Sequence, residues 1–170
     1  MRPISWLGYG LFLAGWLAAG AARSQDVVTT RTQTFRGQVL SVSEAGIRIK
    51  LDQGGEITLP RASVTQVTVT PPPSVLRGLD AYDKGLWREA ARDLSKVMEQ
   101  YLGLDTEWAA KGLLCYGRAS LINRDYDNAA KALEAFLNTY PDHPLILAAQ
   151  IGQASIELHR KQYEPALAHF

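Results

Sequence analysis

The sequence predicts a multi-domain α and β protein, in which a small all-β, barrel-like module precedes an all-α solenoid of helical hairpins. Two observations predict this class. Thr, Val and Ile dominate residues 25–70 and alternate with polar residues, as in half-buried strands. From residue 75 onward an aromatic–x–x–alanine cassette recurs three times, with aromatics 39 and then 37 residues apart, a period in the range of helical-hairpin repeats.

The composition is that of an ordinary globular chain and excludes some partners. The 170 residues are 46% hydrophobic and 21% charged, which is enough for one domain or two small ones. Eighteen basic residues nearly cancel seventeen acidic ones, so there is no basic surplus to hold a nucleic acid backbone. Cys115 is the only cysteine, so no intrachain disulfide can form.

Residues 1–24 have the order of a Sec-type signal peptide. Arg2 precedes an apolar run over residues 4–17, and small residues follow it, so cleavage after Ala22 or Ser24 fits a small–x–small rule. The alternative is an uncleaved anchor, although the run is shorter than the ~20 residues of a membrane span. That anchor would be the only contact with a membrane. We therefore expect a periplasmic or secreted protein.

Residues 25–70 predict four or five short strands. Phe35 to Val42 forms one, with Gly37 as a bulge or bend, and residues 47–51 form the next. A Gly54-Gly55 turn leads to a return strand that ends at Pro60, and residues 64–69 form a further strand. This run resembles small Sm-like barrels. We expect a structural or docking module, because export and near-zero net charge oppose the RNA binding of cytosolic Sm-like proteins.

Residues 71–74 predict a stiff, proline-rich linker between the two halves. Pro71-Pro72-Pro73 favours an extended segment and cannot donate ladder hydrogen bonds. Ser74 is a candidate N-cap for the first helix.

Residues 75–170 predict three helical hairpins, at about 75–104, 106–141 and 143–170. The second hairpin is expected to have helices over 106–123 and 125–139, and the third over 143–160 and from 163 onward. Asp142 is expected to cap the third hairpin, with Pro144 in its first turn. Because the last hairpin stops at Phe170 without a polar cap, we expect it to be truncated.

The repeated slots resemble those of the tetratricopeptide repeat (TPR) family, although the period is longer than the 34 residues of the family. The resemblance implies that small residues let the two helices of a hairpin approach closely. It also implies an exported type found in the bacterial envelope, similar to the coordinator of the Tol–Pal system. The matching residues are Gly78, Trp87, Ala90 and Leu94; Gly117, Tyr126, Ala129, Leu133 and Pro141; and Ala154, Tyr163, Ala166 and Phe170.

The same resemblance implies a partner-binding groove lined by the first helix of each hairpin. Arg118 is expected to take a partner carboxylate in bidentate fashion. Carried over by phase, the groove residues are Leu79, Tyr82, Asp83, Lys111, Leu114, Arg118, Leu121, Ser155, Leu158 and His159.

No residue pattern predicts chemistry. His159 and His169 are ten residues apart, not the four of a helical zinc pair, and the acids from Asp125 onward do not complete a calcium loop. Cys115 lies among apolar residues, as a buried small hydrophobe would. We expect no catalytic, cofactor or metal site and no enzyme activity.

Two functions stay open at this point. The first is a non-catalytic periplasmic scaffold or adaptor that binds a protein or peptide partner of the cell envelope. The second is an accessory repeat region of a larger exported enzyme or sensor, whose active domain lies beyond residue 170. Neither function involves nucleic acid.

Overall fold

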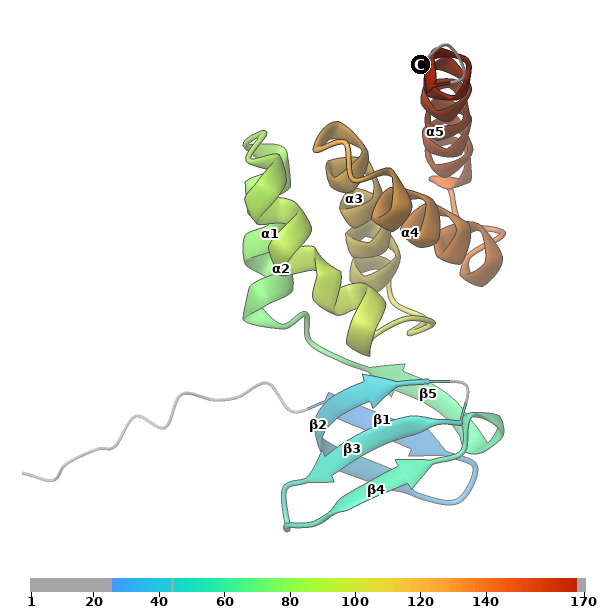
Figure 1. Ribbon diagram of the computed structural model, residues 1–170. Helices are drawn as coiled ribbons and strands as arrows, with labels where there is room; N and C mark the ends of the chain where they lie inside the picture. Colours follow the sequence, from blue (N-terminus) through green and yellow to red (C-terminus); the bar gives the residue numbers. More distant parts are fainter. Residues whose placement is uncertain (1–25, 44, 168–170) are drawn as a thin grey trace, which may run out of the picture.

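The computed structural model describes residues 26–43 and 45–167, with burial and side-chain surroundings as far as residue 160 (Figure 1). The predicted signal peptide, residues 1–24, lies outside the described residues.

Five short strands form one antiparallel sheet in the order β4-β3-β2-β1-β5. The edge strands β4 and β5 follow each other in the chain, joined by a single 3-10 turn, so the sheet bends strongly between them (Figure 1). The strands are β1 (Asp26–Thr30), β2 (Thr34–Val42), β3 (Ile47–Leu51), β4 (Glu56–Leu59) and β5 (Val64–Thr68), and the turn η1 covers Arg61–Ser63.

The alternation predicted for residues 47–51 is confirmed. Ile47 and Ile49 are buried while Arg48 and Lys50 are exposed, as expected of a strand with one face toward the core. Ile49 lies opposite Ile57 on β4, across a turn in which Gly54 has a φ of 95°. Glycine fits there because other residues rarely adopt a positive φ.

The prediction of a bulge at Gly37 is wrong. The register irregularity lies between Val39 and Ser41, whereas Gly37 pairs in regular register with Leu51. A Cβ atom on Gly37 would clash with the Lys50 carbonyl oxygen. The glycine therefore permits a close approach of β2 and β3 rather than a break in their pairing.

Five helices follow, in which α1/α2 and α3/α4 form hairpins. Trp87 and Tyr126 begin the second helix of their hairpins, after left-handed turns at Gly85 (φ 74°) and Arg124 (φ 64°). In Figure 1, α1 and α3 stand side by side, and α2 and α4 cross in front of them. The helices are α1 (Pro73–Asp83), α2 (Trp87–Gln100), α3 (Glu107–Ile122), α4 (Tyr126–Thr139) and α5 (Ile146–Leu167).

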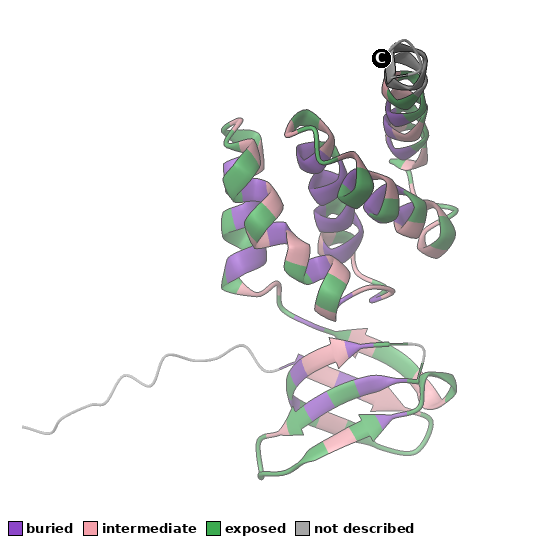
Figure 2. Cartoon of the chain, viewed as in Figure 1, coloured by how far each residue is buried: buried purple, intermediate pink, exposed green. Residues whose placement is uncertain are grey.

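In each hairpin one glycine lets the two helices approach closely, as predicted. A Cβ atom on Gly78 would lie 2.7 Å from Cγ of Leu94, and one on Gly117 would lie 2.8 Å from Cδ2 of Leu133. Leu94 and Leu133 are both fully buried. Figure 2 shows buried residues along the facing sides of these helices.

The predicted fold class is wrong. Residues 26–43 and 45–167 form one five-stranded antiparallel sheet with five helices, so a barrel-like module followed by an all-α hairpin solenoid does not describe them. No pairing joins β4 to β5 within the described residues. The predicted third hairpin is replaced by a single helix, α5, that continues through residue 163 to Leu167.

The turn sequences explain why α5 continues. The first hairpin turns at a glycine, and the second has Asp125, whose side chain caps α4 by accepting from the Asn128 N–H at 3.3 Å. The equivalent positions near residue 161 hold Lys161 and Gln162. Both are good helix formers and poor caps, so the sequence there favours continued helix.

Two predicted helix caps are also wrong. α1 begins at Pro73, because proline suits the first position of a helix, and Ser74 is a buried residue of the first turn. Asp142 does not cap α5, which begins only at Ile146. His143 forms a separate turn before it, accepting the Leu145 N–H on Nδ1 (3.2 Å) and the Ile146 N–H on its carbonyl (3.0 Å).

The turn between α2 and α3, together with the first turn of α3, joins the helices to the β half of the chain. Trp108 donates its Nε1–H to the Val69 carbonyl at 2.9 Å, and Arg61 donates to the Gly103 carbonyl. The Trp108 ring packs edge to face against Tyr101, with centroids 5.4 Å apart. These contacts fix how the helices sit on the sheet.

Candidate functional site

The surface shared by α1 and α3 holds four of the six predicted groove residues that carry polar groups. Lys111, Cys115 and Arg118 are four and three residues apart and so share one face of α3. Tyr82 and Asp83 come from the end of α1, and their side chains lie near enough to this face to influence its titration. We call these five residues the α1–α3 patch.

Tyr82 is the half-buried aromatic of the patch. Its ring packs edge to face on Trp87, with centroids 5.3 Å apart. Burial raises the pKa of the Tyr82 hydroxyl, and the Arg118 charge opposes this rise while Asp83 adds to it. The patch therefore presents a fixed aromatic ring beside charges of both signs.

Lys111, Arg118 and Asp83 are exposed around this ring. Within the described residues, none of the three forms an ion pair. Other exposed acids and bases do pair, as in Arg160–Asp127 between α5 and α4 at 2.8 Å. The charges of the patch are thus available to a partner from outside the described part of the chain.

Cys115 lies beneath these charges and is buried, with 5% exposure. Burial raises the pKa of its thiol to about 11, against smaller opposing effects of Lys111 and Arg118. Because the thiolate is the nucleophilic form, the thiol is unreactive near neutral pH. Its place in the patch is structural.

We expect Cys115 to react about 100-fold more slowly in the folded chain than in the urea-unfolded chain at pH 8. Raising the pKa from 9.0 to about 11 lowers the thiolate fraction by that factor, before any steric protection. The measurement is the labelling rate with a small thiol reagent, corrected with glutathione in the same urea. Equal rates in the two states would contradict the burial of this thiol.

The same shift makes stability depend on alkaline pH. Because the folded pKa lies above the unfolded one, the thiol's contribution is complete below about pH 9 and is lost as pH rises through about 11. Between about pH 9 and pH 11, the free energy of unfolding should therefore fall less for Cys115→Ala than for the unchanged chain. Urea unfolding at pH 8, 9.5 and 11 measures this difference.

The remaining predicted groove residues do not join the patch as exposed side chains. Leu114 is buried, and Leu79 and Leu121 are half-buried against the core. Ser155 donates its hydroxyl to the Ile151 carbonyl of its own helix at 2.8 Å.

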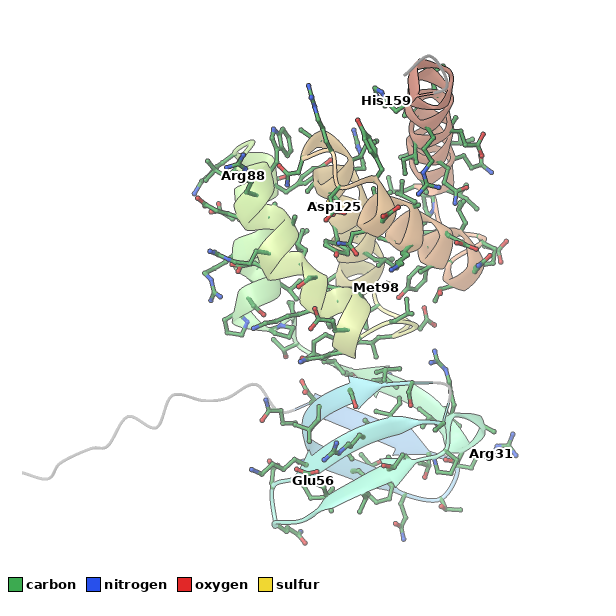
Figure 3. All side chains as sticks on the ribbon, viewed as in Figure 1. Arg31, Glu56, Arg88, Met98, Asp125 and His159 are labelled. Atoms are coloured by element: carbon green, nitrogen blue, oxygen red, sulfur yellow. The ribbon has the colours of Figure 1, made fainter. Side chains whose placement is uncertain are left out.

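His159 stacks on Tyr126 of α4, with ring centroids 5.5 Å apart, and Figure 3 shows it where α5 passes α4. Leu158 is 59% exposed, on the face of α5 opposite the buried Ile156. The predicted groove residues on α5 therefore do not join the α1–α3 patch.

Sequence reasoning missed a cleft of about 590 Å³ at the junction of sheet and helices. Its walls include Asp26, Lys50, Tyr101 and the triple proline. The Asp26 carboxylate is occupied, because it accepts the Val39 N–H at 2.8 Å and the Thr70 N–H at 3.1 Å. The sequence gives one signal of this buried carboxylate, because Asp26 stands directly before the apolar pair Val27-Val28.

Other kinds of site are not found in the described part of the chain. No three His, Cys, Asp or Glu residues among the described residues are grouped to hold a metal ion. None of the helices within residues 73–167 is both long and apolar enough to cross a membrane. Comparison of the chain with protein-family models, curated proteins and solved structures finds no match.

Proposed function

We propose that the chain is a non-catalytic adaptor in the periplasm or outside the cell. In this role it holds a protein or peptide partner of the cell envelope on the α1–α3 patch. The observation that carries this proposal is the set of exposed charges around Tyr82, which form no ion pair within the described residues. The signal peptide predicted for residues 1–24 supports this location.

The chemistry of the patch favours a segment that carries a carboxylate beside an apolar side chain. Lys111 and Arg118 are two helical turns apart and offer two cationic contacts along one line. Arg118 can bind a carboxylate through two parallel N–H donors. Tyr82 offers an aromatic surface next to them, and a rigid aromatic costs little conformational entropy on binding.

The helices that carry the patch are held firmly. Gly78 and Gly117 pack against buried leucines of the second helix in each hairpin, so α1 and α3 are fixed by close interhelical contact. A surface fixed before binding loses little entropy when a partner arrives. A rigid binding surface of this kind suits an adaptor, and binding to it requires no catalytic group.

The test is site-specific photocrosslinking in cells. A photoreactive residue at Lys111 should capture a discrete partner, and adding Arg118→Glu should reduce that capture at least tenfold, because the charge of the carboxylate contact is reversed. The matched control is Arg88→Glu, the same charge change at an exposed residue of α2, in the other layer (Figure 3).

The outcomes separate cleanly. Loss of capture with Arg118→Glu and not with Arg88→Glu supports the patch. Equal capture with both variants, at equal protein levels, removes the patch from consideration. Recovery of labelled chain in the cytoplasm would contradict the exported compartment without affecting the patch.

A further inference from the structure

The outer face of α5 exposes a continuous apolar row. Leu147 and Ile151 are each 67% exposed and Leu158 is 59% exposed, and the exposed Ala154 lies between them. Spacings of four, three and four residues place all of them on one side of the helix. We call Leu147, Ile151, Ala154 and Leu158 the α5 stripe.

The opposite face of α5 already packs against the protein. Ala149 and Ile156 are buried there, and a Cβ atom on Gly152 would lie 2.7 Å from Cδ1 of Leu133. α5 is therefore apolar on two opposite sides, and the other described residues cover only one of them. Helices that are apolar around their circumference are normally buried on all sides.

The corresponding residues of α3 show how far the same positions are buried in the preceding hairpin. The cassette spacing of 37 residues relates Leu147 and Ile151 to Ala110 and Leu114. Ala110 and Leu114 are 1% and 3% exposed. Apolar residues at these places are covered in α3 and uncovered in α5.

We propose that a second copy of this chain covers the α5 stripe, through antiparallel pairing of the two α5 helices about a two-fold axis. The spacings of four, three and four residues read the same in both directions, and every one of the four positions is apolar. Antiparallel pairing thus brings Leu147 against Leu158 of the second copy, and Ile151 against Ala154. Spacings of this kind produce knobs-into-holes packing, with the small alanine receiving the larger isoleucine.

The polar residues beside the stripe fit the same register. The two-fold axis that pairs Leu147 with Leu158 also places Gln150 opposite Ser155, two uncharged side chains. Glu157 is the only charged residue between positions 147 and 158, and it falls opposite Ala148. Between positions 147 and 158 of the two copies, this register brings no like charges together.

The placement of α5 leaves room for a second copy. In Figure 1, α5 stands at the end of the molecule away from the sheet. Four side chains per copy cover less than the ~800 Å² per partner of a stable interface, so we expect a weak dimer that forms with rising concentration.

Sedimentation equilibrium on the purified full chain tests the dimer. The mass is expected to rise toward that of two chains between about 1 and 500 μM, and Ile151→Asp should weaken the association at least tenfold, because the pairing would bury a charge. Leu76→Asp makes the same change at a 51% exposed leucine of α1 and should leave the association unchanged. Arg118→Glu should also leave it unchanged, which separates this dimer from the α1–α3 patch.

Crosslinking tests the register. Leu147→Cys and Leu158→Cys are made separately and treated with a short bifunctional thiol reagent, alone and mixed. Antiparallel pairing predicts crosslinked dimers mainly in the mixture, whereas parallel pairing predicts them in each variant alone. Cys115 contributes the same small background everywhere, because it is buried with a raised thiol pKa.

The proposal is overturned by any of three results. A mass of one chain at all concentrations would mean that something other than a second copy covers the stripe. A dimer that persists with Ile151→Asp would place the interface elsewhere. Crosslinks in the single variants at the yield of the mixture would rule out the antiparallel register.

Discussion

Replacing Leu133 with alanine is expected to lower the free energy of unfolding by about 2–5 kcal/mol. Leu133 is fully buried in α4 and fills the space left by two glycines on other helices. Its Cδ2 atom would lie 2.8 Å from a Cβ on Gly117 of α3, and its Cδ1 atom 2.7 Å from a Cβ on Gly152 of α5. One side chain thus joins three helices, and backbone at two contacts cannot easily move in to fill the gap.

Urea unfolding monitored by helical circular dichroism measures this change. Leu147→Ala is the matched control, because it removes the same atoms from a 67% exposed position and should change stability by less than about 0.5 kcal/mol. A loss below about 1 kcal/mol for Leu133→Ala would mean that α3, α4 and α5 do not pack around this residue as described. The control should be read below the concentration at which the proposed dimer forms.

The same contact explains which parts of the helical half could be predicted from sequence. The recurring small residue and leucine mark positions where one hairpin contacts itself, and Gly78–Leu94 and Gly117–Leu133 behave as predicted. The third member of the series, Ala154, does not, because it is exposed. Sequence phase identifies a packing position, but a partner helix must be present for packing to occur.

The error over the third hairpin has a local cause. Phase alone placed a turn near residue 161, while the residues there, Lys161 and Gln162, favour helix over turn. The earlier turns are set by Gly85 and by the capping side chain of Asp125. At residues 161 and 162 the turn chemistry therefore opposed the phase of the cassette, and the helix continues there.

The candidate site was predictable only in part, for a similar reason. The phase of the repeat assigned Tyr82, Lys111 and Arg118 to one groove, which stays a prediction, although Lys111 and Arg118 share a face of α3 and Arg118 lies near Tyr82. It could not separate exposed from buried members, and Leu114 is buried. The junction cleft depends on contacts between residues far apart in the chain, which no local pattern encodes.

Asp26→Ala is expected to lower the free energy of unfolding by about 2–5 kcal/mol, because it leaves two backbone N–H groups without an acceptor. The buried Asp26 carboxylate accepts from the Val39 N–H in β2 at 2.8 Å and from the N–H of Thr70, directly before the linker, at 3.1 Å. It therefore joins the first strand to both the sheet and the segment that leads to α1. Asp26→Asn keeps one acceptor oxygen and should cost less than Asp26→Ala.

A second readout distinguishes this role from general loss of packing. Burial, with a smaller effect of the Asp26 charge, raises the pKa of Tyr101 across the junction cleft. Both Asp26→Ala and Asp26→Asn remove that charge, so both should lower the Tyr101 pKa in an ultraviolet titration, although they differ in stability. Asp52→Ala, at an exposed acid that also lines the cleft, should leave stability nearly unchanged. If Asp26→Ala is as stable as Asp52→Ala, the carboxylate does not hold the two halves of the protein together.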